Sequence, residues 1–215
     1  MNENFVETQY DITKKSRFLN FYQKNKILIF LGITILLVAL FSIFFYLDKK
    51  ENDKLELADN YIQAEIYLEK KNIDEAKRLL KKVIYENDST YSPLSLFLLT
   101  DRNLVKSKEE LMNLFNHVLE NNKFDDEIKN LIILKKLIIQ SDYSNEDEIL
   151  NTARIIINSN SLWKPHALLL LGDYFTFNKE YMKAKEFYEK ILSINNLDNK
   201  MHDKAKLKLA LISNE

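Results

Sequence analysis

An uncharged stretch of 21 residues, from Ile27 to Leu47, lies close to the N-terminus of this chain. Sixteen of these residues are Leu, Ile, Phe or Val. An α-helix of this length would be about 31 Å long, close to the ~30 Å hydrocarbon core of a bilayer. A surface helix of a soluble protein would carry a polar face, and this stretch has none. Residues 27–47 are therefore predicted to be a transmembrane helix.

A cleaved signal peptide is the main alternative for this stretch. Signal peptides have a shorter apolar run that is followed by small residues at a cleavage site. Here the run is long, and Tyr46, Asp48 and Lys49 stand at its end with nothing small among them. We therefore expect the helix to remain in the protein as its anchor.

Basic residues flank the expected anchor unevenly. The fifteen residues before it contain Lys14, Lys15, Arg17, Lys24 and Lys26, and the fifteen after it contain Lys49, Lys50 and Lys54. The flank with more basic residues stays in the cytoplasm. We therefore expect residues 1–26 to form a short cytoplasmic tail and residues 48–215 to lie across the membrane, which in a bacterium is the periplasmic side of the inner membrane.

Composition excludes several classes of fold and site. The chain has only 2 glycines and 2 prolines, whereas sheet-rich folds and phosphate-binding loops need turn glycines. It has no cysteine, which excludes disulfides, thiolate metal sites and a lipidated cysteine anchor. The formal net charge is −1, so the chain does not carry the dense positive charge that binding of nucleic acid requires. An all-α protein that does not bind nucleic acid is the class that remains.

After the anchor, apolar residues recur three and four positions apart in short stretches separated by polar joints, which is typical of amphipathic helices. The expected elements are four helical pairs, at residues 53–70 and from Asn72, 92–104 and from Ser107, 125–140 and from Asn145, and 163–177 and 178–194, followed by a capping helix at 201–212. Asn72, Ser107 and Asn145 each precede a glutamate by three residues, as in a capping box. Ser92, followed by Pro93, is expected to cap the first helix of the second pair.

The second helices repeat at a regular interval. Ala76, Leu111, Leu150 and Ala184 are expected to be equivalent, with separations of 35, 39 and 34 residues. Two-helix repeats of about 34 residues are the tetratricopeptide signature. The fourth pair matches its small and large positions best, at Leu168, Leu171, Gly172, Phe175, Ala184 and Tyr188. The predicted fold is a transmembrane helix followed by a tetratricopeptide-like α-solenoid.

Two local motifs add a resemblance to a known family. They are the stretch from Asn160 to Ala167, which contains Trp163 and Pro165, and the stretch from Tyr91 to Leu94. With one N-terminal anchor and degenerate helical pairs, the chain resembles the YfgM-like ancillary subunits of the Sec translocon. These are membrane-anchored periplasmic tetratricopeptide proteins of Gram-negative bacteria.

The resemblance implies a scaffold or chaperone-network protein. Its implied partners are the Sec translocon, a periplasmic chaperone and the clients that emerge from the channel. Two other functions stay open. One is an envelope-assembly or cell-division adaptor with the same fold and no Sec partner, and the other is an organelle import receptor whose repeats face the cytosol.

The sequence carries no pattern that indicates an enzyme. His117, His166 and His202 fall on three different expected helices, without the local spacing of metal ligands. The acidic runs 125–127 and 146–148 stand at helix starts, where they complement the helix dipole. We expect no catalytic residue, metal, cofactor or small-molecule substrate, and we expect Trp163 to pack between repeats.

Partner binding is expected on the concave surface, which the first helices line in stacked tetratricopeptide pairs. The predicted groove residues are Tyr61, Glu65 and Leu68 from the first pair and His166, Leu169, Asp173 and Phe177 from the last. Apolar and aromatic groups would supply burial, and the acids would orient the partner and reject others.

Overall fold

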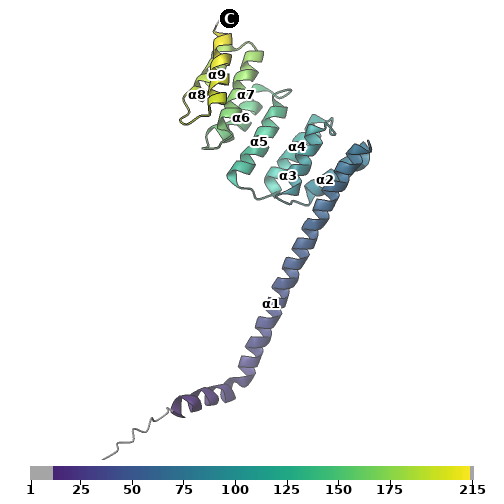
Figure 1. The fold of residues 1–215 in the computed structure, drawn as a ribbon, viewed down its shortest axis with the longest axis vertical. Helices are drawn as coiled ribbons and strands as arrows, with labels where there is room; N and C mark the ends of the chain where they lie inside the picture. The colour runs from purple at the N-terminus through teal and green to yellow at the C-terminus, as the bar shows by residue number, and fades with distance from the viewer. Residues whose placement is uncertain (1–11, 214–215) are drawn as a thin grey trace, which may run out of the picture. The chain divides into compact units, whose positions relative to one another are not determined.

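The computed structural model describes residues 12–213, and these residues form helices and no strands (Figure 1). The all-α prediction is confirmed. The chain divides into two compact units, one that ends at Glu56 and one that begins at Leu57.

Helix α1 (Ile12–Glu69) is a single helix of 58 residues. Among the described residues it is the one helix that is long and apolar enough to span a membrane, with a mean hydropathy of 3.0 in its most apolar window and no buried residue there. The first helix of the first pair, expected separately at 53–70, is the C-terminal part of α1. No glycine or proline lies between Gly32 and Pro93, so nothing in the sequence breaks the helix after Leu47.

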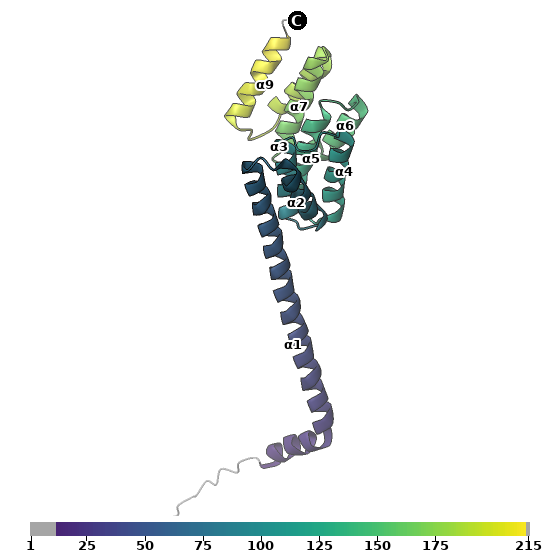
Figure 2. The same ribbon diagram turned by 90° about the vertical axis from the view of Figure 1, so that its right-hand side faces the viewer.

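The second unit contains the remaining helices (Figure 2). They are α2 (Ile73–Tyr85), α3 (Tyr91–Asp101), α4 (Lys108–Asn121), α5 (Asp126–Gln140), α6 (Glu146–Ile157), α7 (Lys164–Phe177), α8 (Tyr181–Leu192) and α9 (Asn199–Ile212). Each corresponds to a predicted helix, with ends that differ by about three residues at most, as is usual for helix boundaries. Helices α3 with α4, α5 with α6 and α7 with α8 form consecutive antiparallel pairs.

Three of the predicted N-caps are confirmed. Asn72, Ser107 and Asn145 accept hydrogen bonds from the backbone N–H three residues later, at 3.5, 3.2 and 3.0 Å. The prediction for Ser92 is wrong. Helix α3 begins at Tyr91, and the Asp88 carboxylate accepts from the N–H groups of Thr90 and Tyr91 at 2.8 Å. Ser92 lies inside the first turn, where its buried hydroxyl donates to the Val83 carbonyl at 3.1 Å.

In three pairs, the turn between the two helices contains a residue in the left-handed backbone conformation. Lys71, Asn103 and Lys179 have φ angles of 59°, 51° and 62°. In each turn the next residue's N–H bonds back to the carbonyl five residues earlier, for example from Glu180 to Phe175 at 2.9 Å. This is the Schellman arrangement that ends helices, here built without glycine.

The structure corrects the register of the third pair. Counted from the first residue of each second helix, the fourth residues are Ala76, Leu111, Ile149 and Ala184. The predicted equivalence of Leu150 is therefore wrong by one residue. Ile149 is fully buried, whereas Leu150 is half-buried.

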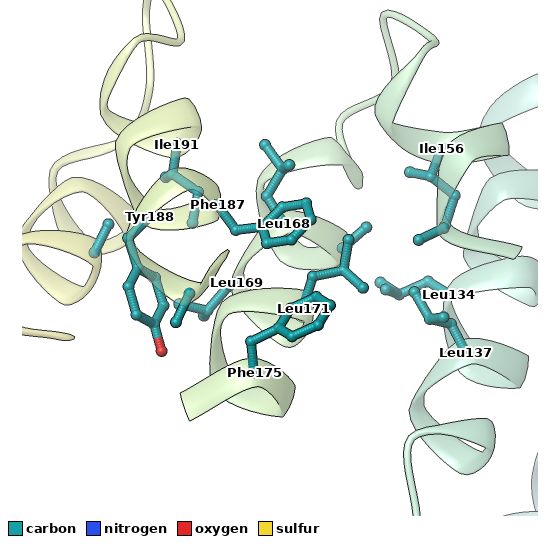
Figure 3. Close-up of a cluster of buried hydrophobic side chains, with 14 of the residues drawn as sticks. Leu134, Leu137, Ile156, Leu168, Leu169, Leu171, Phe175, Phe187, Tyr188 and Ile191 are labelled. Carbon is teal, nitrogen blue, oxygen red and sulfur yellow. The ribbon is translucent and has the colours of Figure 1, made fainter. Parts of the chain in front are cut away.

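The buried apolar side chains form two clusters. One contains Ala64 of α1 with residues of α2, α3 and α4 and Ile132 of α5, and the other runs from α5 to α9. Leu119 of α4 packs against both. In the second cluster, leucines of α7 lie between side chains of α8 on one side and of α5 and α6 on the other (Figure 3). The aromatic rings of Phe175 and Phe187 stack there, with centroids 5.5 Å apart.

Candidate partner-binding surface

The three predicted groove residues of α1 lie close together. Tyr61 is half-buried and its ring is 6.2 Å from that of Tyr91. Burial, with the nearby Glu65 carboxylate, raises the pKa of Tyr61, so this phenol stays neutral. Glu65 and Leu68 line a cavity of about 250 Å³ that also includes Leu98 and Arg102. A small polar recess is therefore present at this position.

The four predicted residues of α7 are divided between the surface and the interior. His166 is exposed, with its ring 5.6 Å from that of Trp163, and Phe177 is 87% exposed. Leu169 is only 7% exposed, because it belongs to the second hydrophobic cluster. Asp173 accepts hydrogen bonds from the Tyr188 hydroxyl at 2.8 Å and from Lys208 Nζ of α9 at 2.9 Å. Two of the four side chains are thus held by the chain's own helices.

The predicted α1 and α7 residues do not share a pocket in the described part of the chain. Tyr61 packs against the first hydrophobic cluster, whereas Leu169 belongs to the second. A partner that touched both sets would have to extend along the first helices of all four pairs.

An apolar groove lies between α3 and α5, the first helices of the second and third pairs. Its volume is about 540 Å³. Its lining residues are Ser89, Thr90, Pro93, Leu94 and Phe97 on the α3 side and Lys123, Phe124, Asp125, Ile128 and Leu131 on the α5 side. Leu94 is 42% exposed and Ile128 is 44% exposed. We call this feature the α3–α5 groove.

A lysine bridges α3 and α5 beside the groove. Lys135 Nζ of α5 lies 3.2 Å from the Asp101 carboxylate of α3 and 5.5 Å from the centroid of the Phe97 ring. The ion pair and the cation–π contact both connect the two helices at the surface. A polar contact therefore lies at one end of the groove.

Sequence reasoning missed the α3–α5 groove, although α3 carries a signal for it. Its sequence, YSPLSLFLLTD, is apolar on more than one face. Leu96 and Leu99 fill the core, which leaves Leu94 exposed and Phe97 half-buried at the edge of the first cluster. A short helix with more apolar residues than one buried stripe can hold must expose some of them.

The junction between the third and fourth pairs is built on Glu127. Its carboxylate accepts from the Ser161 hydroxyl at 2.9 Å and from the Leu162 N–H at 3.2 Å. Its backbone carbonyl accepts from the Trp163 indole N–H at 3.0 Å. The prediction that Trp163 packs between repeats is confirmed. The Glu127 carboxylate, expected only to complement the dipole of its own helix, also accepts hydrogen bonds from Ser161 and Leu162.

The histidines and acidic residues of the described part of the chain are dispersed. Within residues 12–213, no cluster of three or more His, Asp or Glu side chains could hold a metal ion. His117 lies edge-on to Tyr85, with ring centroids 4.7 Å apart, and is far along the chain from His166 and His202.

The chain matches a known protein family. A family model described as a tetratricopeptide repeat-like domain matches residues 19–214. The matched range includes the apolar part of α1 as well as the helical pairs. No curated protein and no solved structure matches the chain.

Proposed function

The chain belongs to the family of tetratricopeptide repeat-like domains, and we propose that it is a membrane-anchored scaffold that binds partner proteins through the α3–α5 groove. The observation that carries this proposal is the row of apolar side chains in that groove. Leu94 and Ile128 are exposed, and Phe97 is half-buried beside them. Apolar and aromatic groups in a recess are typical anchors of a protein interface.

The proposed anchor is the apolar part of α1, residues 27–47. An apolar helix of this length with no side chain buried against the protein would expose a large apolar surface to water. The larger number of basic residues before Ile27 supports a cytoplasmic N-terminus and a periplasmic repeat unit.

The proposed partners are the Sec translocon, a periplasmic chaperone and clients emerging from the channel. The resemblance of the stretches 91–94 and 160–167 to the ancillary translocon subunits supports this assignment. The first-helix residues Tyr61 and Phe177 are proposed as the outer contacts of a partner that extends beyond the groove.

Site-specific photo-crosslinking in native membranes tests the proposal. A photoreactive phenylalanine analogue replaces Leu94 or Ile128 in the full-length protein, and a third protein carries it at Tyr85 as a control. Tyr85 is an exposed aromatic residue on α2, a second helix. Crosslinks to translocon subunits or chaperones from positions 94 and 128, and none from 85, are the expected result.

Two further proteins separate the groove from the anchor. The Tyr61→Ala/Phe177→Ala protein should keep its helical content and membrane insertion yet lose part of its copurifying partners. If partners are kept by this protein and by Leu94→Ala/Ile128→Ala but lost when residues 27–47 are exchanged for an unrelated anchor, the helical repeats do not form the binding site. Crosslinks to cell-division or envelope-assembly proteins alone would favour the adaptor function.

A further inference from the structure

Helix α9 has one face that packs on the protein. Met201, Ala205 and Ile212 are buried, and α9 contacts α8 and, more lightly, α7 (Figures 1 and 2). Lys208 fixes the helix further through its ion pair with Asp173 at 2.9 Å. This face belongs to the core of the repeat unit.

Another side of α9, about a third of a turn around the helix from the buried face, carries a stripe of four exposed residues. At 3.6 residues per turn, Lys200, Lys204, Leu207 and Leu211 lie along one side of the helix, since they are spaced by four, three and four positions. Leu207 is 61% exposed and Leu211 is 60% exposed. The two lysines are also exposed. We call these four residues the α9 stripe.

Helix α9 carries more positive than negative charge. The helix contains Lys200, Lys204, Lys206 and Lys208 and a single acid, Asp203. Only Lys208 of the four lysines has an ion-pair partner among the described residues. The chain as a whole has a formal net charge of −1, so this positive patch is local.

From this charge and shape we propose that the α9 stripe binds an amphipathic helix of a partner protein, with leucine-like residues at one end of its contact face and acidic residues at the other. The apolar half would pack on Leu207 and Leu211, and the acidic half would pair with Lys200 and Lys204. Opposite charges across an interface select the partner and fix its direction. In an antiparallel arrangement, the apolar residues come first in the partner's sequence.

A second copy of the chain fits the stripe poorly. Two stripes would bring four lysines together with no acidic residue among them, and like charges across an interface are unfavourable. An anionic lipid surface also fits poorly. Interfacial helices insert a broad apolar face into the membrane, and here Met201, Ala205 and Ile212 of α9 are already buried in the protein.

The inference goes beyond the proposed function, because the stripe lies on a different helix from the α3–α5 groove. Variants of one surface should leave the other unaffected. Leu94→Ala/Ile128→Ala is therefore expected to bind a stripe-directed peptide as the wild type does, and a stripe variant should retain its groove crosslinks.

The experiment uses the full-length protein in phosphatidylcholine nanodiscs and two fluorescent synthetic peptides of about 20 residues, a length at which an isolated helix can form. One peptide has an alanine-rich helix with two leucines spaced by four, followed three positions later by two glutamates spaced by four. The other has lysines in place of the glutamates. Fluorescence anisotropy is expected to show binding of the glutamate peptide about tenfold or more tighter than binding of the lysine peptide.

The variants are chosen among exposed residues, so the fold is retained. Lys200→Glu/Lys204→Glu should reverse the preference between the two peptides, and Leu207→Ala/Leu211→Ala should weaken glutamate-peptide binding by about tenfold. Lys106→Glu/Lys129→Glu makes the same change in net charge on exposed residues before α4 and within α5 and should leave binding unchanged. Equal binding of the two peptides, or an equal loss in this control, would overturn the proposal.

Two other occupants would also be detected. The chain has no cysteine, so Ala210→Cys provides a single thiol beside the stripe. Oxidative crosslinking of two copies through this thiol would assign the stripe to self-association. A blue shift of a fluorescent label at this thiol in phosphatidylglycerol nanodiscs, absent in phosphatidylcholine nanodiscs, would assign it to lipid. Either result would contradict the proposal that the stripe binds a partner helix.

Discussion

The ring of Tyr188 occupies the space that a side chain at Gly172 would need. A Cβ at Gly172 would lie 2.7 Å from Cδ1 and 2.8 Å from Cζ of that ring. Tyr188 is fully buried, and its hydroxyl donates to Asp173 at 2.8 Å, so the ring is held at both ends. The absence of a side chain at Gly172 is what allows α7 and α8 to approach each other closely.

Gly172→Ala should therefore destabilise the repeat unit. The added methyl group overpacks the contact with Tyr188, at a cost of about 1–3 kcal/mol that exceeds the gain in helix propensity. Thermal unfolding followed by circular dichroism measures the change. Gly32→Ala is the matched control, since a Cβ there would meet nothing within 4 Å. Equal melting temperatures for Gly172→Ala and wild type would contradict the close contact.

The Tyr188 hydroxyl should make stability depend on alkaline pH. Burial, with the hydrogen bond to Asp173, raises the pKa of Tyr188 well above its ordinary value of 10.0. Because the folded state favours the neutral phenol, its contribution is fully present below about pH 10 and is lost as the pH rises further. Tyr188→Phe should lose about 1 kcal/mol at neutral pH but show a shallower decline in stability above pH 10. Parallel curves of unfolding free energy against pH would exclude this role.

Lys179→Gly should stabilise the protein. Lys179 has a φ of 62° in the turn between α7 and α8, a conformation that glycine adopts without the penalty for a Cβ. The expected gain is about 1 kcal/mol, measured by urea unfolding. Lys71→Gly, at a φ of 59°, should give a similar gain. Lys70 precedes Lys71 and does not have a positive φ, so Lys70→Gly should give no gain in stability. A gain for Lys70→Gly would indicate a general effect of removing a lysine.

The helices of this fold could be predicted from sequence because their signals are local. An uncharged run marks the apolar part of α1, and Asn72, Ser107 and Asn145 mark helix starts by side-chain hydrogen bonds within one turn. The end of the anchor helix could not be predicted in the same way. The change from apolar to charged residues at Asp48 marks where the helix would leave the membrane. It does not end the helix, because charged residues are compatible with helical structure.

The candidate surface was harder to predict because it depends on contacts between distant residues. Leu169 and Asp173 are spaced as residues on one exposed side of a helix would be. In the structure, however, Leu169 packs in the second cluster and Asp173 pairs with Lys208. The Ser92 prediction failed for a similar reason, since Asp88 accepts from the Tyr91 N–H at the start of α3 and the Ser92 hydroxyl donates to the Val83 carbonyl instead of capping the helix. Single-helix periodicity contains none of this information.

The orientation of the chain can be measured with single cysteines. Ser213→Cys should react with a membrane-impermeant maleimide added to intact spheroplasts, because residues 48–215 are expected outside the cytoplasm. Ser16→Cys should react only after the membrane is permeabilised. The native chain has no cysteine, so any labelling reports on the introduced thiol. The opposite pattern would place the repeat unit in the cytoplasm and favour the receptor function.

The corrected register of the third pair predicts different costs for two neighbouring substitutions. Ile149 is fully buried in the second cluster, so Ile149→Ala should lower the unfolding free energy by about 2–5 kcal/mol through lost burial and the cavity left behind. Leu150 is half-buried and packs at the cluster's edge, so Leu150→Ala should cost clearly less. Both variants remove apolar atoms from the same turn of α6 and change helix propensity in the same direction, which makes each a control for the other. Urea unfolding of the two proteins compares them directly. A larger loss for Leu150→Ala would restore the spacing of 39 residues read from the sequence and displace Ile149 from the position equivalent to Ala76, Leu111 and Ala184.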